Sequence, residues 1–155
     1  MSAISDSCRL ALLIGDFANQ DGGKVGLLGG GWSITPTPTP PQAVVVIIEV
    51  PGEHLNETFA VELTLFDEQG PLALPDPLTG ETRPLRIAQN MLAPTIPGIP
   101  RKAWNKVHFV INLSPGLPLR PDHVYTWAAS VDGDTRSDWK TSFYVVDQPA
   151  PPVVG

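Results

Sequence analysis

Two segments of the chain alternate hydrophobic with mostly polar residues. Residues 58–65 carry apolar side chains at every odd position, and residues 106–113 repeat this arrangement. Since successive side chains of a β-strand point to opposite faces, a period of two is typical of a strand with one buried face. Residues 43–50 differ, because they form an almost unbroken β-branched run. That pattern predicts a central strand or one covered on both faces.

The 18 prolines gather between the segments that we predict as strands. Proline cannot donate a hydrogen bond to a sheet, so it is excluded from strand interiors. Five further proline-free segments predict strands: 8–17, 24–34, 85–87, 125–131 and 139–145. Eight strands and no convincing helix predict an all-β fold, a two-sheet antiparallel β-sandwich of immunoglobulin-like type.

The sandwich is predicted to fill residues 1–147 as a single domain, followed by an extended proline-rich tail, 148–155. The first hairpin should join 8–17 to 24–34 across a glycine-containing turn, and 35–41 should be an extended polyproline-type connector. The expected core consists of Leu10, Leu12, Val46, Ile48, Phe59, Val61, Leu63, Phe109, Ile111, Tyr125, Trp127, Phe143 and Val145.

A tyrosine near the start of a late strand resembles a tyrosine corner. Tyr125 follows Leu119 and Pro121 at suitable offsets. In such a corner the tyrosine hydroxyl bonds to the backbone a few residues upstream. We therefore expect a hydrogen bond between the Tyr125 hydroxyl and a backbone group near Leu119 or Arg120; the alternative is a tyrosine that merely begins a strand.

Two connections, 68–82 and 90–104, are long for a small domain, and loops of this length often carry function or cover a sheet edge. The second holds Trp104 close to Arg101 and Lys102. An aromatic side chain beside a cation is typical of an interaction hot spot. Arg101, Lys102 and Trp104 are therefore candidate partner-binding residues, although Trp104 could instead cap the core and the cations could be ordinary solvated surface.

The charge of the chain bears on its partners. The formal net charge is −6 and the pI is about 4.8, which argues against nucleic acid, because phosphate neutralisation needs clustered Lys and Arg. No apolar run approaches the roughly 18 residues of a membrane span. The N-terminus lacks the basic region of a signal peptide, so we expect a cytoplasmic or virion location. Cys8 is the single cysteine and is in phase with Leu10 and Leu12, which favours a buried position over a reactive thiol.

Catalytic and cofactor motifs do not survive inspection. Ser137 and Lys140 match S-x-x-K, but on a strand an offset of three sends them to opposite faces. The glycine run 26–31 lacks the phosphate-binding order and predicts a bulge or close backbone approach. Possible calcium ligands (Asp132, Asp134, Asp138) and zinc ligands (His54, His108, His123) lack the spacing of known sites. We therefore predict no catalytic residue, no cofactor and no metal site.

Both ends of the chain resemble a family of uncharacterised bacterial and phage all-β proteins, a domain-of-unknown-function family. The likeness lies in the strand 10–15, the turn 16–24 and the strand 25–29, and again between Pro121 and Val146 around a Val-Asp-Gly turn. These stretches cover roughly half of the chain. The resemblance implies the fold and no mechanism.

Two classes of function remain. The first is a non-enzymatic protein-binding or assembly module of bacterial or phage origin, such as a virion structural or accessory protein or a cytoplasmic interaction protein. Its partner would be another protein or a second copy of the chain, through the two long loops. The second is a small-ligand-binding domain or an enzyme whose site is scattered over loops.

Overall fold

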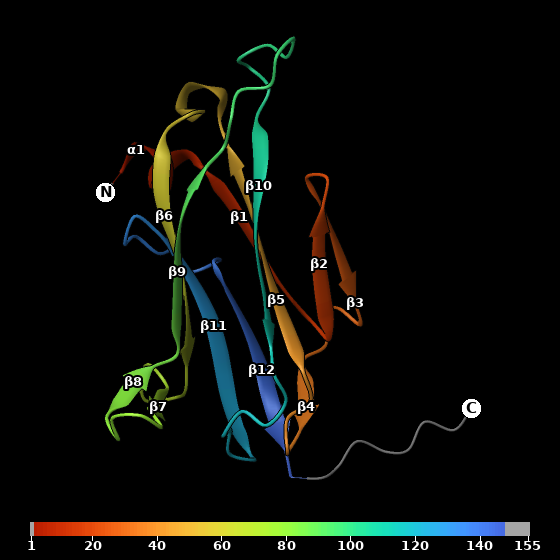
Figure 1. Ribbon diagram of the computed structural model, residues 1–155, viewed down its shortest axis with the longest axis vertical. Helices are drawn as coiled ribbons and strands as arrows, with labels where there is room; N and C mark the ends of the chain where they lie inside the picture. The colour runs from red at the N-terminus through yellow and green to blue at the C-terminus, as the bar shows by residue number, and fades with distance from the viewer. Residues whose placement is uncertain (1, 148–155) are drawn as a thin grey trace, which may run out of the picture.

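The computed structural model describes residues 2–147, and nearly all of its regular structure is β-strand (Figure 1). A short helix, a 3-10 turn and twelve strands follow one another along this part of the chain: α1 (Ala3–Ser7), β1 (Arg9–Gly15), β2 (Phe17–Asp21), β3 (Lys24–Leu28), β4 (Ile34–Pro36), β5 (Gln42–Val50), η1 (Gly52–His54), β6 (Thr58–Phe66), β7 (Ala73–Pro75), β8 (Thr82–Pro84), β9 (Arg86–Leu92), β10 (Asn105–Leu113), β11 (His123–Val131) and β12 (Lys140–Val146). The predicted tail 148–155 lies outside the described residues.

Two sheets face each other across one core. The first has the order β1-β5-β10 and the second the order β4-β12-β11-β6-β9, with every pair antiparallel except β4 and β12. Side chains of both sheets, such as Val46, Phe59 and Trp127, meet in a single buried cluster. The predicted all-β sandwich is therefore confirmed, while its immunoglobulin-like character stays a prediction.

The expected core residues lie in this cluster. Ten of them are buried, and Leu10, Leu12 and Ile111 are half-buried against it. Alternation places the core residues of β6, β10 and β11, because only one face of each of these strands turns toward the opposite sheet.

β5 is covered on both faces, as its β-branched run predicts. Its even-numbered residues enter the sandwich core, while Ala43 and Val45 pack under the β2–β3 hairpin, which lies on the outer face of the first sheet. Asn112 of β10 fixes this hairpin, because its amide donates to the Ala18 carbonyl (2.9 Å) and accepts from the Ala18 N–H (3.0 Å).

The first hairpin differs from the prediction. We expected 8–17 to pair with 24–34. Instead β1 pairs with β5, and within these two segments the hairpin is limited to β2 and β3, around Gly22 and Gly23. The chain turns between β1 and β2, where the Leu27 side chain packs so closely on Gly15 that a Cβ there would lie 2.4 Å from its Cδ1. Gly30 lies under the same side chain, since a Cβ there would lie 2.6 Å from Leu27 Cδ2; the bulge or close backbone approach expected at the glycine run stays a prediction.

Three short strands fall in segments that we expected to be connections. Residues 35–36 of the predicted polyproline connector belong to β4 and pair in parallel with β12. The long loop 68–82 contains β7 and the first residue of β8, and these two strands form a small hairpin. Backbone pairing there depends on the neighbouring strands, which proline content alone does not reveal.

The predicted hydrogen bond of Tyr125 is present. The backbone N–H of Arg120 donates to the Tyr125 hydroxyl (2.8 Å), and the buried ring stacks on Phe143 with centroids 5.8 Å apart. The segment that leads into β11 is thereby tied to the second sheet. Across residues 2–147 we find no helix of the length and apolarity that a membrane crossing requires.

Candidate interaction surface

The three predicted partner-binding residues lie on the connection 93–104, which joins β9 to β10 at one end of the molecule (Figure 1). The Trp104 side chain is 39% exposed. Its cation partner is Arg9 at the start of β1, whose guanidinium carbon lies 4.6 Å from the indole centroid. Trp104 is thus held by a cation while one part of the ring stays open to solvent. Sequence reasoning missed Arg9 because nothing in the sequence brings β1 beside this loop.

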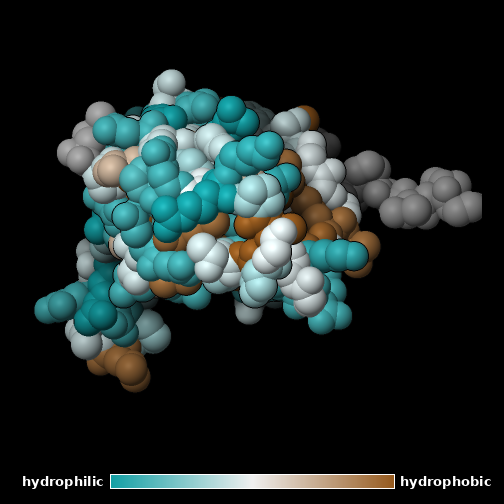
Figure 2. Space-filling model, turned by 90° about the horizontal axis from the view of Figure 1, so that it is seen from above, coloured by the Kyte–Doolittle hydropathy of each residue, from teal (hydrophilic) through white to brown (hydrophobic). Residues whose placement is uncertain are grey.

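Two further large apolar side chains are exposed on the same loop. Ile96 is 47% exposed and Ile99 is 52% exposed. Together with Trp104 they border a small cavity of about 20 Å³ over Leu55. Seen from this end, brown apolar surface lies between hydrophilic side chains (Figure 2). We call Ile96, Ile99 and Trp104 the apolar loop surface, and contiguous exposed apolar surface is typical of an interaction site.

The loop is held in place at both of its ends. At the first, Asn56 donates to the Thr95 hydroxyl (3.3 Å) and accepts from the Thr95 N–H (3.1 Å). At the second, the loop packs so tightly on Gly52 that a Cβ there would lie 1.4 Å from the Arg101 carbonyl oxygen. A loop ordered in this way loses less conformational entropy on binding than a free one.

Basic side chains gather at this end of an acidic chain. Arg9, Arg101, Lys102 and Lys106 are four of the ten Lys and Arg residues. Among residues 2–147, only Lys106 of these four has a carboxylate within 4.0 Å, namely Glu49 across the β5–β10 ladder. The other three cations are open to a negatively charged partner.

A groove runs beside the apolar loop surface. Residues of β9 and β10 and of the β2–β3 hairpin tip line a space of about 710 Å³. In Figure 1, β10 lies between β9 and the hairpin. β9 and β10 are edge strands of the two sheets. The groove therefore lies along the side of the sandwich where both sheets have an edge. We call it the edge groove.

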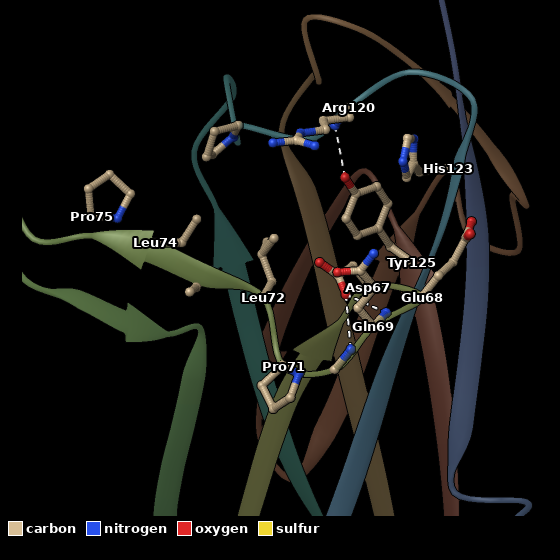
Figure 3. Close-up of a pocket in the computed structure, with 13 residues that line it drawn as sticks. Asp67, Glu68, Gln69, Pro71, Leu72, Leu74, Pro75, Arg120, His123 and Tyr125 are labelled. Atoms are coloured by element: carbon tan, nitrogen blue, oxygen red, sulfur yellow. Dashed lines mark hydrogen bonds between the residues drawn. The ribbon is translucent and has the colours of Figure 1, made fainter.

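A second hollow, of about 540 Å³, lies beside the β7–β8 hairpin. Figure 3 shows Leu72 and Leu74 on one side of it, with Glu68 and His123 across from them. Arg120 also lines it. Acidic, basic and imidazole groups therefore meet around one space.

The polar groups of this hollow are occupied by the nearby backbone. One Asp67 carboxylate oxygen accepts two backbone N–H groups of its own turn, and Glu68 accepts from Val124 N–H (2.9 Å). His123 Nδ1 donates to the Pro121 carbonyl (2.8 Å). The Tyr125 hydroxyl is taken by the corner described above. These groups shape loops, and among the described residues that line the hollow no nucleophile is hydrogen-bonded to a base.

The candidate ligands rejected from the sequence have structural roles. Asp134 accepts hydrogen bonds from the Ser5 hydroxyl (2.7 Å) and from the Ser2 N–H (3.2 Å), and these bonds lower the pKa of its carboxyl. Arg136 donates to two carbonyls of α1, so the N-terminal segment is fixed to the turn before β12. Across residues 2–147, no three His, Cys, Asp or Glu side chains are grouped to hold a metal.

The thiol of Cys8 lies in the core. Cys8 is 1% exposed, and burial raises its pKa although Arg136 lowers it in part. The thiolate is the reactive form of cysteine, so this position suits packing, as its phase with Leu10 and Leu12 predicts.

No protein-family model, no curated protein and no solved structure matches the chain. The resemblance to a family of bacterial and phage proteins accordingly stays a prediction.

Proposed function

We propose that the chain is a non-enzymatic protein-binding or assembly module that meets its partner with the apolar loop surface. The observation that carries the proposal is the exposure of Ile96, Ile99 and Trp104 on one anchored loop. Burying these side chains stabilises a complex, and because each is only 39–52% exposed, each can contribute roughly half of the about 1.5–3 kcal/mol that full burial of a large apolar residue provides. A partially exposed tryptophan stacked with an arginine is the kind of anchor that dominates interface energy.

The cations around this surface that have no carboxylate partner within residues 2–147 favour the same role. Arg101 and Lys102 flank the apolar residues, which resembles the polar rim of an interface around an apolar centre. Such charges speed the encounter with a complementary partner. A virion structural or accessory protein and a cytoplasmic interaction protein are two forms of this proposal.

The experiment compares the wild type with Trp104→Ala and with a matched control, Leu78→Ala. Leu78 is 93% exposed on the β7–β8 turn, so the control removes an apolar side chain from the other long loop. Sedimentation velocity over a range of concentrations measures self-association, and quantitative affinity capture measures other partners.

We expect Trp104→Ala to weaken association by at least about tenfold, a change of about 1.4 kcal/mol, and Leu78→Ala to leave it unchanged. A wild type that neither self-associates nor captures a specific partner would contradict the proposal. Equal loss in both variants would show that the loss is not specific to the apolar loop surface and would contradict the proposal.

The hollow beside β7–β8 favours a second candidate, a small-ligand-binding domain. Its volume of about 540 Å³ is in the range of ligand pockets, and Arg120 and His123 border it. Thermal shift measurements with a panel of small carboxylates and phosphates test this candidate. A shift abolished by Arg120→Ala and retained in Trp104→Ala would support it over the binding module.

A further inference from the structure

The free backbone groups of β10 follow from the ladder of its sheet. The Ile14 carbonyl accepts from Gly31 N–H (2.8 Å), so even-numbered residues of β1 face away from β5. Backbone groups in an antiparallel ladder alternate between the two sides. The even-numbered residues of β5 therefore bond to β10, and the register pairs them with odd-numbered residues of β10. The N–H and C=O groups of His108 and Val110 consequently point outward.

A second observation agrees with this assignment. The backbone N–H of Lys106, which has the same parity as His108, donates to the side chain of Asn105 (2.9 Å) instead of to β5. Both observations therefore show that the backbone groups of the even-numbered residues of β10 point away from β5.

The unpaired backbone groups of β9 can be assigned from the hydrogen bonds of the residues that flank this strand, Leu85 and Ala93. The Leu85 carbonyl accepts from Leu65 N–H (3.0 Å), and the Ala93 carbonyl accepts from Asn56 N–H (2.8 Å). Odd-numbered positions of β9 therefore face β6. The backbone of even-numbered residues, Asn90 among them, points away from β6 along the edge.

Neither edge is paired within residues 2–147. No hydrogen bond joins the backbone of His108, Val110 or Asn90 to another described residue outside the ladders. Exposed rows of N–H and C=O groups are templates for an added strand. Peptides that bind by strand addition gain affinity from these main-chain bonds and specificity from the adjacent side chains.

The charges of the edge groove indicate the occupant. Lys106 and His108 line it together with no acidic residue, although the Lys106 ammonium also lies 4.0 Å from the Glu49 carboxylate of β5. Arg101 and Lys102 stand at the loop that leads into β10. A second copy of β10 would add another Lys106 ammonium to the same groove, so repulsion between the two ammonium groups disfavours self-pairing. A segment with acidic side chains is favoured instead.

We propose that the outer edge of β10 binds an extended peptide segment carrying acidic side chains, by β-strand addition. This rests on the proposed function, because it names the chemistry of the partner at the surface described above. The peptide would extend the three-stranded sheet by one strand and place its carboxylates near Lys106 and His108.

The deciding variant is His108→Pro. Proline removes an N–H that the fold does not use, and edge strands tolerate proline at such positions. The variant should therefore fold, which circular dichroism and a melting curve check, while the added strand loses a central hydrogen bond. Ala88→Pro is the matched control, because Ala88 holds the equivalent outward position on β9. His108→Ala separates the effect of the side chain from that of the N–H.

The probe is a displayed library of random peptides of about ten residues, enough to span β10. Peptides selected on the wild type are synthesised, labelled and titrated by fluorescence anisotropy. We expect enrichment of proline-free, acidic sequences whose affinity falls at least about tenfold in His108→Pro, stays unchanged in Ala88→Pro and falls clearly less in His108→Ala than in His108→Pro. Lys106→Glu should weaken binding about threefold to tenfold at low salt, and the difference should shrink at high salt.

Amide hydrogen exchange gives an independent measurement. Bound peptide should slow exchange at His108 and Val110 and leave Asn90 unchanged, because only paired edge amides become protected. Selected peptides that are basic, that bind His108→Pro equally, or that protect β9 would overturn the proposal. The same holds if no peptide is enriched.

The two proposals fail in different ways. If Trp104→Ala weakens partner capture while no selected peptide depends on the His108 N–H, the binding module stands and strand addition is wrong. If the wild type binds neither protein partner nor peptide, both are wrong.

Discussion

Tyr125→Phe tests the corner that joins the Pro121 segment to the second sheet. The substitution removes one hydroxyl oxygen and keeps the ring that stacks on Phe143. Arg120 N–H then loses its acceptor, 2.8 Å away in the wild type. A donor left without a partner in a buried position costs about 1–3 kcal/mol.

The structure places the expected loss in the lower part of that range. Tyr125 is 2% exposed, so water cannot replace the hydroxyl from the core side. Arg120, however, is an exposed residue, and water reaches it from outside. We therefore expect a loss of about 1–2 kcal/mol in the free energy of unfolding, or about 2–8 °C in Tm for a chain of this size.

Urea unfolding followed by fluorescence measures this change, with an unaltered m-value as the sign that only stability has changed. Tyr144→Phe is the matched control, since the Tyr144 hydroxyl donates to Asp122 (2.9 Å) at an exposed position. We expect the control to cost less than about 0.5 kcal/mol. Equal losses in the two variants, or a loss below about 0.3 kcal/mol in Tyr125→Phe, would refute the reasoning.

Two further predictions concern the loop anchor and the N-terminal segment. Gly52→Ala should destabilise the fold by about 1–3 kcal/mol or more, because its Cβ would collide with the Arg101 carbonyl oxygen. Urea unfolding measures this loss against the control Gly26→Ala, whose Cβ would meet only the flexible end of a side chain. Equal losses in the two variants would contradict the prediction. The hydrogen bonds that lower the pKa of Asp134 should make the wild type more stable than Asp134→Asn near neutral pH. This difference in the free energy of unfolding should shrink as the pH falls below about 4 and through the folded-state pKa. Unfolding measured as a function of pH checks this, and a difference that stays constant down to a pH of about 2.5 would contradict it.

Alternation in the sequence predicts burial well and pairing poorly. β6 and β10 follow from period two because one face of each strand must enter the core, and β5 follows from its continuous run because both faces are covered. β1 shows that alternation does not predict which strands pair. The apolar positions of β1 fit the core equally well whether its neighbour is β3 or β5. The close packing of Leu27 on Gly15, which turns the chain after β1, depends on residues that are not adjacent in sequence.

The candidate surface was predictable only in part. Trp104 is a candidate from sequence because an aromatic residue lies beside the cations Arg101 and Lys102 in a long loop. The contact of Arg9 with Trp104 requires β1 and the 93–104 loop to meet at one end of the sandwich, and no local pattern encodes that meeting. The exposed positions of Ile96 and Ile99 likewise depend on where the loop is anchored.

The edge groove illustrates the same limit and gives a reason for its proposed use. An edge strand and a half-buried central strand share one alternation pattern, so sheet order must be known before a free edge can be found. On the opposite side of the sandwich, Gly31 bonds to the β1 edge and β4 ends at Pro36. Proteins commonly guard edges in these ways. No proline interrupts β9 or β10. The sheet edges that border the edge groove therefore lack this safeguard against pairing with another strand, and an added strand would bind there most readily.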